Sequence, residues 1–103
     1  MRNEKLKKEE ILMYLLNNKN LFNDKFNIYK IGIFGSYARN EQTENSDIDI
    51  IMEMKLDTTE IYEKKRDLRK MLEEQFNRKI DICRERSIKT IFRNFVKNEA
   101  IYV

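Results

Sequence analysis

The sequence of 103 residues contains no histidine and no proline, and it has only one cysteine and two glycines. Without histidine, which is the commonest general base and metal ligand, catalysis must use carboxylates, hydroxyls, basic side chains or metal ions. The single cysteine, Cys83, excludes an internal disulfide and a multi-cysteine zinc site, and it is compatible with a reducing compartment. Because no apolar run is long enough to span a bilayer and no signal-peptide core follows the charged start, we expect a cytoplasmic protein that does not contact membranes.

The length and the charge balance limit the possible organisation of the chain. The length is typical of one domain, so we expect residues 1–103 to form a single domain whose acceptor substrate is held largely by a partner surface. Charged residues make up 38% of the chain, but the 18 acids are interspersed among the 21 bases. This mixture gives no argument for nucleic-acid binding, and no direct contact with nucleic acid is expected.

Apolar residues recur at helical spacing in three stretches of the sequence. They predict helices over 4–18 and 57–76 and a final helix that Ser87 caps, and we interpret Asp57 and Glu60 as a capping pair for the second of them. The asparagines between the first helix and the next element favour a turn. The apolar stripe of the final helix is expected to belong to the core, which is more frequent than an interface.

Three other stretches are rich in β-forming residues or alternate at strand period, and they predict strands over 26–34, 47–52 and 79–83. A short connection joins the first two strands, so we expect them to be antiparallel, with Gly35 and Asp47 at the same end. The connection is predicted to begin with a short helix over 35–39. The elements together predict an α+β fold with about three core strands flanked by helices.

The second predicted strand presents two carboxylates on one side. Asp47 and Asp49 are two positions apart, so both point to the face opposite Ile48. Such close like charges repel each other unless a cation lies between them, and hard oxygen ligands suit Mg²⁺ or Mn²⁺. Asp81 lies in a strand of the same alternating type and joins the pair if the two strands are neighbours. Three carboxylates can hold two metal ions about 3.5–4 Å apart, a geometry that serves phosphoryl or nucleotidyl transfer.

A glycine and a serine follow the first predicted strand. Gly35 and Ser36 offer free backbone N–H groups and a hydroxyl, and glycine lets a phosphate approach the backbone closely. Arg39 lies three residues after Ser36, on the same face of a helix, and can add a positive charge to that phosphate. The pattern predicts that a triphosphate binds next to the metal ions.

Each of these features has an ordinary structural interpretation when it is taken alone. A glycine-serine pair commonly forms a turn with a cap, and alternating acids commonly form a solvated strand face. Arg39 is by default a surface charge, and Cys83 is by default a packed thiol. The functional interpretation is favoured because a glycine turn, a fixed interval and an alternating acidic strand occur together.

The segments FGSYARN (34–40) and SDID (46–49) resemble the G-S-x10-D-x-D signature of the polymerase-β-like nucleotidyltransferase superfamily. The longer string is similar to its minimal nucleotidyltransferase subgroup, the MNT or MntA type. Relatives often have glycine where this chain has Asn40, and asparagine tolerates the same backbone conformation. The resemblance implies a mixed sheet flanked by helices, with ATP and two Mg²⁺ ions at the end of the first strand.

By motif position, the resemblance also implies roles for individual residues. Asp47 and Asp49 would be metal ligands, Asp81 would be the third acid and the base for the acceptor hydroxyl, and Ser36 would contact the triphosphate. Proteins of this kind are commonly encoded beside a HEPN-type ribonuclease toxin, and they act as its antitoxin by transferring AMP to a tyrosine of that partner. This chain cannot itself be the toxin, because the HEPN ribonuclease motif needs a histidine.

The leading hypothesis is therefore adenylylation of a toxin partner, with which the chain could form a hetero-oligomer. Two alternatives stay open. A small-molecule nucleotidyltransferase would use the same three acids, although such enzymes usually carry an added domain for the acceptor. A non-catalytic antitoxin would mask its toxin by binding alone.

Overall fold

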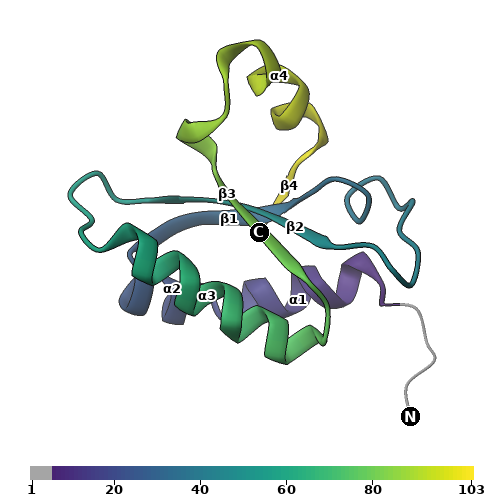
Figure 1. Ribbon diagram of the computed structural model, residues 1–103, viewed down its shortest axis with the longest axis horizontal. Coiled ribbons are helices and arrows are strands. Elements are labelled where there is room, and N and C mark those ends of the chain that lie inside the picture. Colours follow the sequence, from purple (N-terminus) through teal and green to yellow (C-terminus); the bar gives the residue numbers. More distant parts are fainter. Residues whose placement is uncertain (1–5) are drawn as a thin grey trace.

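The structure is a computed structural model that describes residues 6–103. It contains a four-stranded sheet with helices on both faces (Figure 1). In chain order the elements are α1 (Lys8–Asn17), α2 (Lys19–Phe26), β1 (Ile28–Phe34), β2 (Ile48–Met54), α3 (Ile61–Phe76), β3 (Ile80–Arg84), a 3₁₀ turn (Glu85–Ser87), α4 (Thr90–Glu99) and β4 (Ile101–Tyr102). The strand order is β3-β2-β1-β4, in which β1 is antiparallel to β2 and β4, and β2 is parallel to β3. The expected α+β class and mixed sheet are confirmed.

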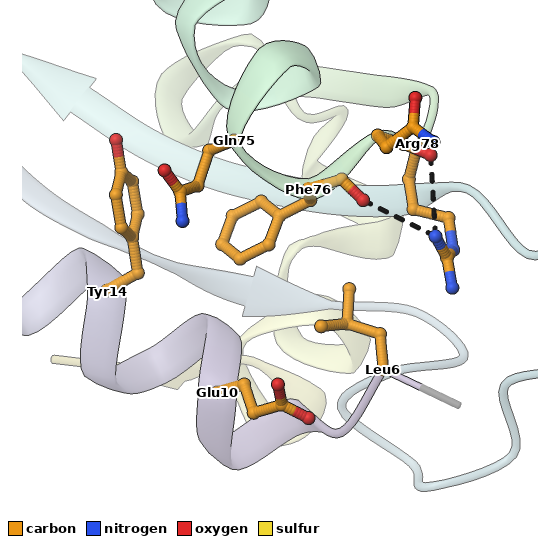
Figure 2. Close-up of a pocket in the computed structure, with 7 residues that line it drawn as sticks. Leu6, Glu10, Tyr14, Gln75, Phe76 and Arg78 are labelled. Atoms are coloured by element: carbon orange, nitrogen blue, oxygen red, sulfur yellow. Dashed lines mark hydrogen bonds between the residues drawn. The ribbon is translucent and has the colours of Figure 1, made fainter. Parts of the chain in front are cut away.

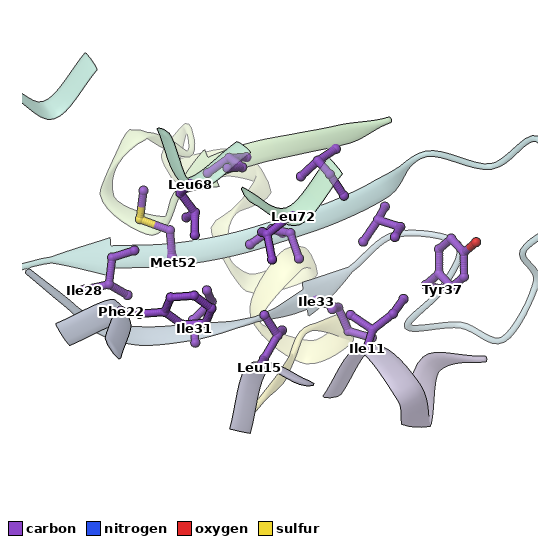
Figure 3. Packing of buried hydrophobic residues seen from close by; sticks show 14 of the residues in the cluster. Ile11, Leu15, Phe22, Ile28, Ile31, Ile33, Tyr37, Met52, Leu68 and Leu72 are labelled. Carbon is purple, nitrogen blue, oxygen red and sulfur yellow. The ribbon is translucent and has the colours of Figure 1, made fainter. Parts of the chain in front are cut away.

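The core lies between the sheet and the three helices α1, α2 and α3, which cover one face (Figures 1 and 3). Alternating apolar positions of the strands, such as Ile33 and Ile50, point toward side chains such as Leu15 of α1 and Leu72 of α3, and all four are fully buried. Burial of each such side chain contributes about 1.5–3 kcal/mol. The strand positions between them therefore face the other side of the sheet, where α4 lies.

The segment with many asparagines forms a helix, α2, rather than the turn that the sequence predicted. Phe22 and Phe26 are four residues apart, so a helix places both on one face, and both are buried against the sheet. The burial of two aromatic side chains outweighs the weak turn preference of asparagine. Phe26 therefore ends α2, and β1 begins only at Ile28, after Asn27 in the left-handed conformation.

Several element boundaries differ from the expected ones. The expected start of the first helix lies partly outside the described residues, and α1 begins at Lys8. The helix α3 begins at Ile61, with Glu60 at a φ of 55°, so the predicted capping pair is not formed. Ser87 lies in the 3₁₀ turn, and Lys89 precedes α4. Residues 35–40 form turns, not a helix. No helix within residues 6–103 has both the length and the apolar character that crossing a membrane requires.

The apolar stripe of α4 does not belong to the core. Ile91, Phe92 and Phe95 are 81%, 56% and 65% exposed, and none of residues 90–99 is buried. The sheet face beneath α4 carries the charged Lys30 and Glu53 together with the fully buried Ile51, and no side chain of α4 is buried against it. The expectation that the stripe is core was therefore wrong.

Candidate active site

The sheet brings the three predicted acids together at one end. In the antiparallel ladder Phe34 of β1 pairs with Asp49 of β2, so Gly35 and Asp47 lie at the same end, as predicted. In the parallel ladder Asp49 pairs with Asp81 of β3, which confirms that β2 and β3 are neighbours. Since Ile48 and Ile50 face the core, Asp49 lies on the opposite face of the sheet, at the centre of the site.

Asp49 is the most electrostatically perturbed of the three acids. Burial, followed by the negative charges of Asp81 and Asp47, raises the pKa of Asp49 to about 6. Asp49 is half-buried, whereas Asp47 and Asp81 are exposed. The site therefore concentrates negative charge that a bound cation would neutralise.

Gly35 makes room for the Asp49 carboxylate. Its φ is +76°, in the left-handed region, and a Cβ at this position would lie 2.1 Å from Oδ2 of Asp49. Glycine therefore meets two requirements here, the left-handed turn at the end of β1 and the close packing of β2 against that turn. Asn40, which closes the turn, has a φ of 64°, as its sequence position predicted.

Replacement of Gly35 tests this packing. A left-handed conformation costs an alanine about 1–2 kcal/mol. We expect Gly35→Ala to destabilise the protein by more than this, because the alanine Cβ must also displace the Asp49 carboxylate. Asn40→Ala is the matched control, since Asn40 has a similar backbone conformation. Urea unfolding of both variants measures the difference. Equal losses would mean that Asp49 does not pack against the glycine.

The other predicted phosphate contacts lie in the same turn, and one has a partner that the sequence did not reveal. Ser36 is half-buried, and its carbonyl oxygen accepts a hydrogen bond from the Glu41 N–H at 2.8 Å. The Arg39 guanidinium donates to Glu41 and also to Oε1 of Glu99 at 2.9 Å. The backbone N–H of Gly35 donates to Oε2 of Glu99 at 2.7 Å. Glu99 is separated by 60 residues or more from both donors, so no local sequence pattern indicates this contact.

One cavity of the structure is separate from the acidic residues. It measures about 340 Å³ and lies between α1 and the end of α3, where Leu6, Tyr14 and Phe76 surround it (Figure 2). None of the six predicted site residues lines it. The acids instead lie on the face of the sheet that carries α4, where the side chains of Asp47 and Asp81 are exposed.

The donor chemistry at the acidic site fits Mg²⁺ or Mn²⁺. Asp47, Asp49 and Asp81 supply hard carboxylate oxygens, and a divalent cation would offset both the burial and the like charges that raise the pKa of Asp49. Within residues 6–103, however, no three acidic or cysteine side chains are oriented so that they could together hold a metal ion. The carboxylates would therefore have to rotate toward a shared ion.

Comparisons with known proteins agree with this geometry. The Nucleotidyltransferase domain family matches residues 16–103. The chain is similar to protein adenylyltransferase MntA of Thermococcus cleftensis, with 32% identity over 95 residues, 92% of this chain and 94% of the relative. A structure provisionally described as a minimal nucleotidyltransferase is 25% identical, with a TM-score of 0.78 over 96% of this chain and 98% of that one. A crystal structure of a toxin-antitoxin with AMP-PNP is 26% identical, with a TM-score of 0.66 over 94% of this chain and 72% of that one.

The mixed sheet, the glycine turn and the acidic strand beside it define a class of enzymes that transfer nucleotidyl groups. The chain belongs to the nucleotidyltransferase domain family. The resemblance that the segments FGSYARN and SDID indicated is thereby confirmed, and so is the expected fold.

Proposed function

We propose that this protein is an antitoxin that transfers AMP from ATP to a tyrosine of a HEPN-type toxin partner. The observation with the greatest weight is that Asp49 pairs in register with Asp81 while Gly35 packs against its carboxylate. This arrangement supports a triphosphate at the turn and an attacking hydroxyl at the acids. The similarity to protein adenylyltransferase MntA supports AMP as the transferred group and a protein as the acceptor.

In the proposed reaction, the acceptor hydroxyl oxygen bonds to the α-phosphorus of ATP, and the bond from that phosphorus to the oxygen bridging to the β-phosphate breaks. Pyrophosphate leaves with the bonding electron pair, and the hydroxyl proton passes to the Asp81 carboxylate, which is exposed and can accept it. The N–H of Gly35, the Ser36 hydroxyl and Arg39 bind the triphosphate. Asp47, Asp49 and Asp81 would hold Mg²⁺, which supplies activation of the attacking oxygen and charge neutralisation when it is bound.

Two observations support a protein acceptor. Asp47 and Asp81 are exposed, and α4 on the same side of the sheet exposes Ile91, Phe92 and Phe95, a type of apolar surface that commonly marks a protein interface. One of the similar solved structures is that of a toxin-antitoxin with AMP-PNP, which supports a toxin as the partner. The chain would then form a hetero-oligomer in which the partner completes the acceptor side of the site.

Intact-mass spectrometry of the protein mixed with its toxin partner, ATP and Mg²⁺ tests the proposal. We expect mass increments of AMP on the toxin and none when its acceptor tyrosine is changed to phenylalanine. A toxin that is neutralised without any increment would show that the protein masks its partner by binding. Increments on an added small alcohol or sugar, with none on the toxin, would show that the acceptor is a small molecule.

A further inference from the structure

The donors assigned to the triphosphate are already paired with a carboxylate of the same chain. Glu99 accepts hydrogen bonds from the Gly35 N–H at 2.7 Å and from Arg39 at 2.9 Å. Its side chain is only 11% exposed, compared with 68% for Glu41, the other acidic partner of Arg39. Glu99 therefore lies within the turn at the end of β1, whereas Glu41 lies at its surface.

The position of Glu99 is unfavourable for the helix that carries it. It is the last residue of α4, where the helix dipole is negative and an acidic side chain is destabilising. The carboxylate also adds negative charge next to Asp49, whose pKa it helps to raise. The two donors at the turn compensate for these costs, so the contact is specific to the turn and does not serve to cap α4.

We propose that Glu99 occupies the phosphate position of the nucleotide site and competes with the triphosphate for the Gly35 N–H and Arg39. This inference rests on the proposed function, which places the triphosphate at these donors. A carboxylate and a phosphate both present charged oxygens to an N–H and a guanidinium, and both cannot use the same donors at once. ATP binding therefore requires that Glu99 leave the turn.

The packing of α4 allows such a movement. None of residues 90–99 is buried, and an open cavity of about 420 Å³ lies between α4 and the sheet, lined by residues that include Tyr29, Arg93 and Lys97. Figure 1 shows α4 as an arch above the sheet, on the face opposite the other three helices. β4 pairs with β1 at Gly32 and Ile33 and fixes the chain directly after Glu99, so the movement is confined to the Glu99 side chain and the last turn of α4.

Calorimetric titration with ATP and Mg²⁺ tests the competition directly. We expect Glu99→Gln to bind ATP at least about tenfold more tightly than the wild type, because the competing charge-assisted hydrogen bonds are weakened. Glu41→Gln is the matched control, since Glu41 also pairs with Arg39 but does not contact Gly35, and its affinity should stay within about twofold of the wild type. Equal or weaker binding by Glu99→Gln than by the wild type would overturn the competition and leave the proposed function intact.

A second measurement uses the unmodified protein, so it does not depend on the folding of a variant. At saturating ATP and Mg²⁺, amide hydrogen exchange at the end of α4 should become faster, because Glu99 no longer holds it against the turn. Unchanged exchange in the nucleotide-bound protein would contradict the proposal. If neither the wild type nor Glu99→Gln binds ATP, the nucleotide site itself is wrong, and the proposed function is overturned together with this inference.

Discussion

The Asp49→Asn variant should lose AMP transfer by at least about a hundredfold while it remains folded. Loss of one preorganised electrostatic contact at a reacting centre typically lowers the rate by about 10²–10³. Asparagine has the shape of aspartate, so the packing against Gly35 is kept. Asp24→Asn, an exposed acid on α2 and thus on the other face of the sheet, is the matched control and should transfer AMP at the wild-type rate. Full activity of Asp49→Asn would remove this residue from the site.

The same variant should also be more stable than the wild type at pH 7–8. Because burial and the neighbouring acids raise the pKa of Asp49 to about 6, the folded protein disfavours the charged carboxylate above that pH. Ionised Asp49 therefore lowers the free energy of unfolding of the wild type. This destabilisation is complete above the folded pKa and decreases as the pH falls toward the unfolded pKa of about 3.9. Thermal unfolding of both proteins in the absence of divalent ions measures the difference. The higher melting temperature of Asp49→Asn should fall to that of the wild type as the pH is lowered from about 6 to about 4. A variant that is less stable at pH 8 would contradict the like-charge arrangement.

A second large effect is expected at Glu53, which is 2% exposed on the face of the sheet that carries α4. Its carboxylate accepts hydrogen bonds from the Arg86 N–H and the Met54 N–H, both at 2.8 Å, and it forms ion pairs with Arg84 at 2.9 Å and Arg86 at 3.0 Å. These contacts fix the chain at the end of β3, where it turns toward α4. Glu53→Gln should destabilise the protein by about 2–3 kcal/mol at pH 7, slightly below the usual loss for a broken buried pair because Arg86 is 37% exposed.

The pH dependence of the free energy of unfolding distinguishes loss of the Glu53 charge from a change in side-chain packing. Burial alone would raise the pKa of Glu53, but the hydrogen bonds from Arg86, Met54 and Arg84 outweigh it and lower that pKa. The ionised Glu53 carboxylate therefore stabilises the fold fully above its unfolded pKa of about 4.3. This stabilisation is lost as the pH falls through the lower pKa that Glu53 has in the folded protein. Urea unfolding should show the wild type and Glu53→Gln converging below about pH 4. Asp67→Asn, which breaks an exposed pair with Arg66, should change stability by less than about 0.5 kcal/mol at any pH.

The sheet and the acidic strand were predictable because their signals are local. Alternation at period two fixes which face of β2 carries Ile48 and Ile50 and which carries Asp49, whatever the rest of the chain does. The short connection after Gly35, without a long helical segment, favours antiparallel pairing of β1 and β2, and that pairing brings the glycine turn to the acids. The sequence also contained the motif by which the family could be identified.

The errors occurred where distant contacts outweighed local preferences. The asparagine-rich segment became α2 because Phe22 and Phe26 find a hydrophobic surface that no local pattern shows. The periodicity of α4 predicts a core stripe, but α4 finds no surface that buries it, so Ile91 and Phe95 remain exposed. In both cases the identity of the facing surface, and not the periodicity, decided the outcome.

The sequence by itself thus determined the strands, the glycine turn and the face of β2 that carries Asp49, because period and turn chemistry depend on neighbouring residues. Only the tertiary structure decided that Asp81 pairs with Asp49 and that Glu99 reaches the Gly35 N–H. The parallel pairing of β2 and β3 depends on the path of α3, which connects them. The hydrogen bond between Gly35 and Glu99 joins residues 64 positions apart and depends on where the end of α4 lies relative to the sheet. Neither contact can be predicted from the spacing of side chains along the sequence.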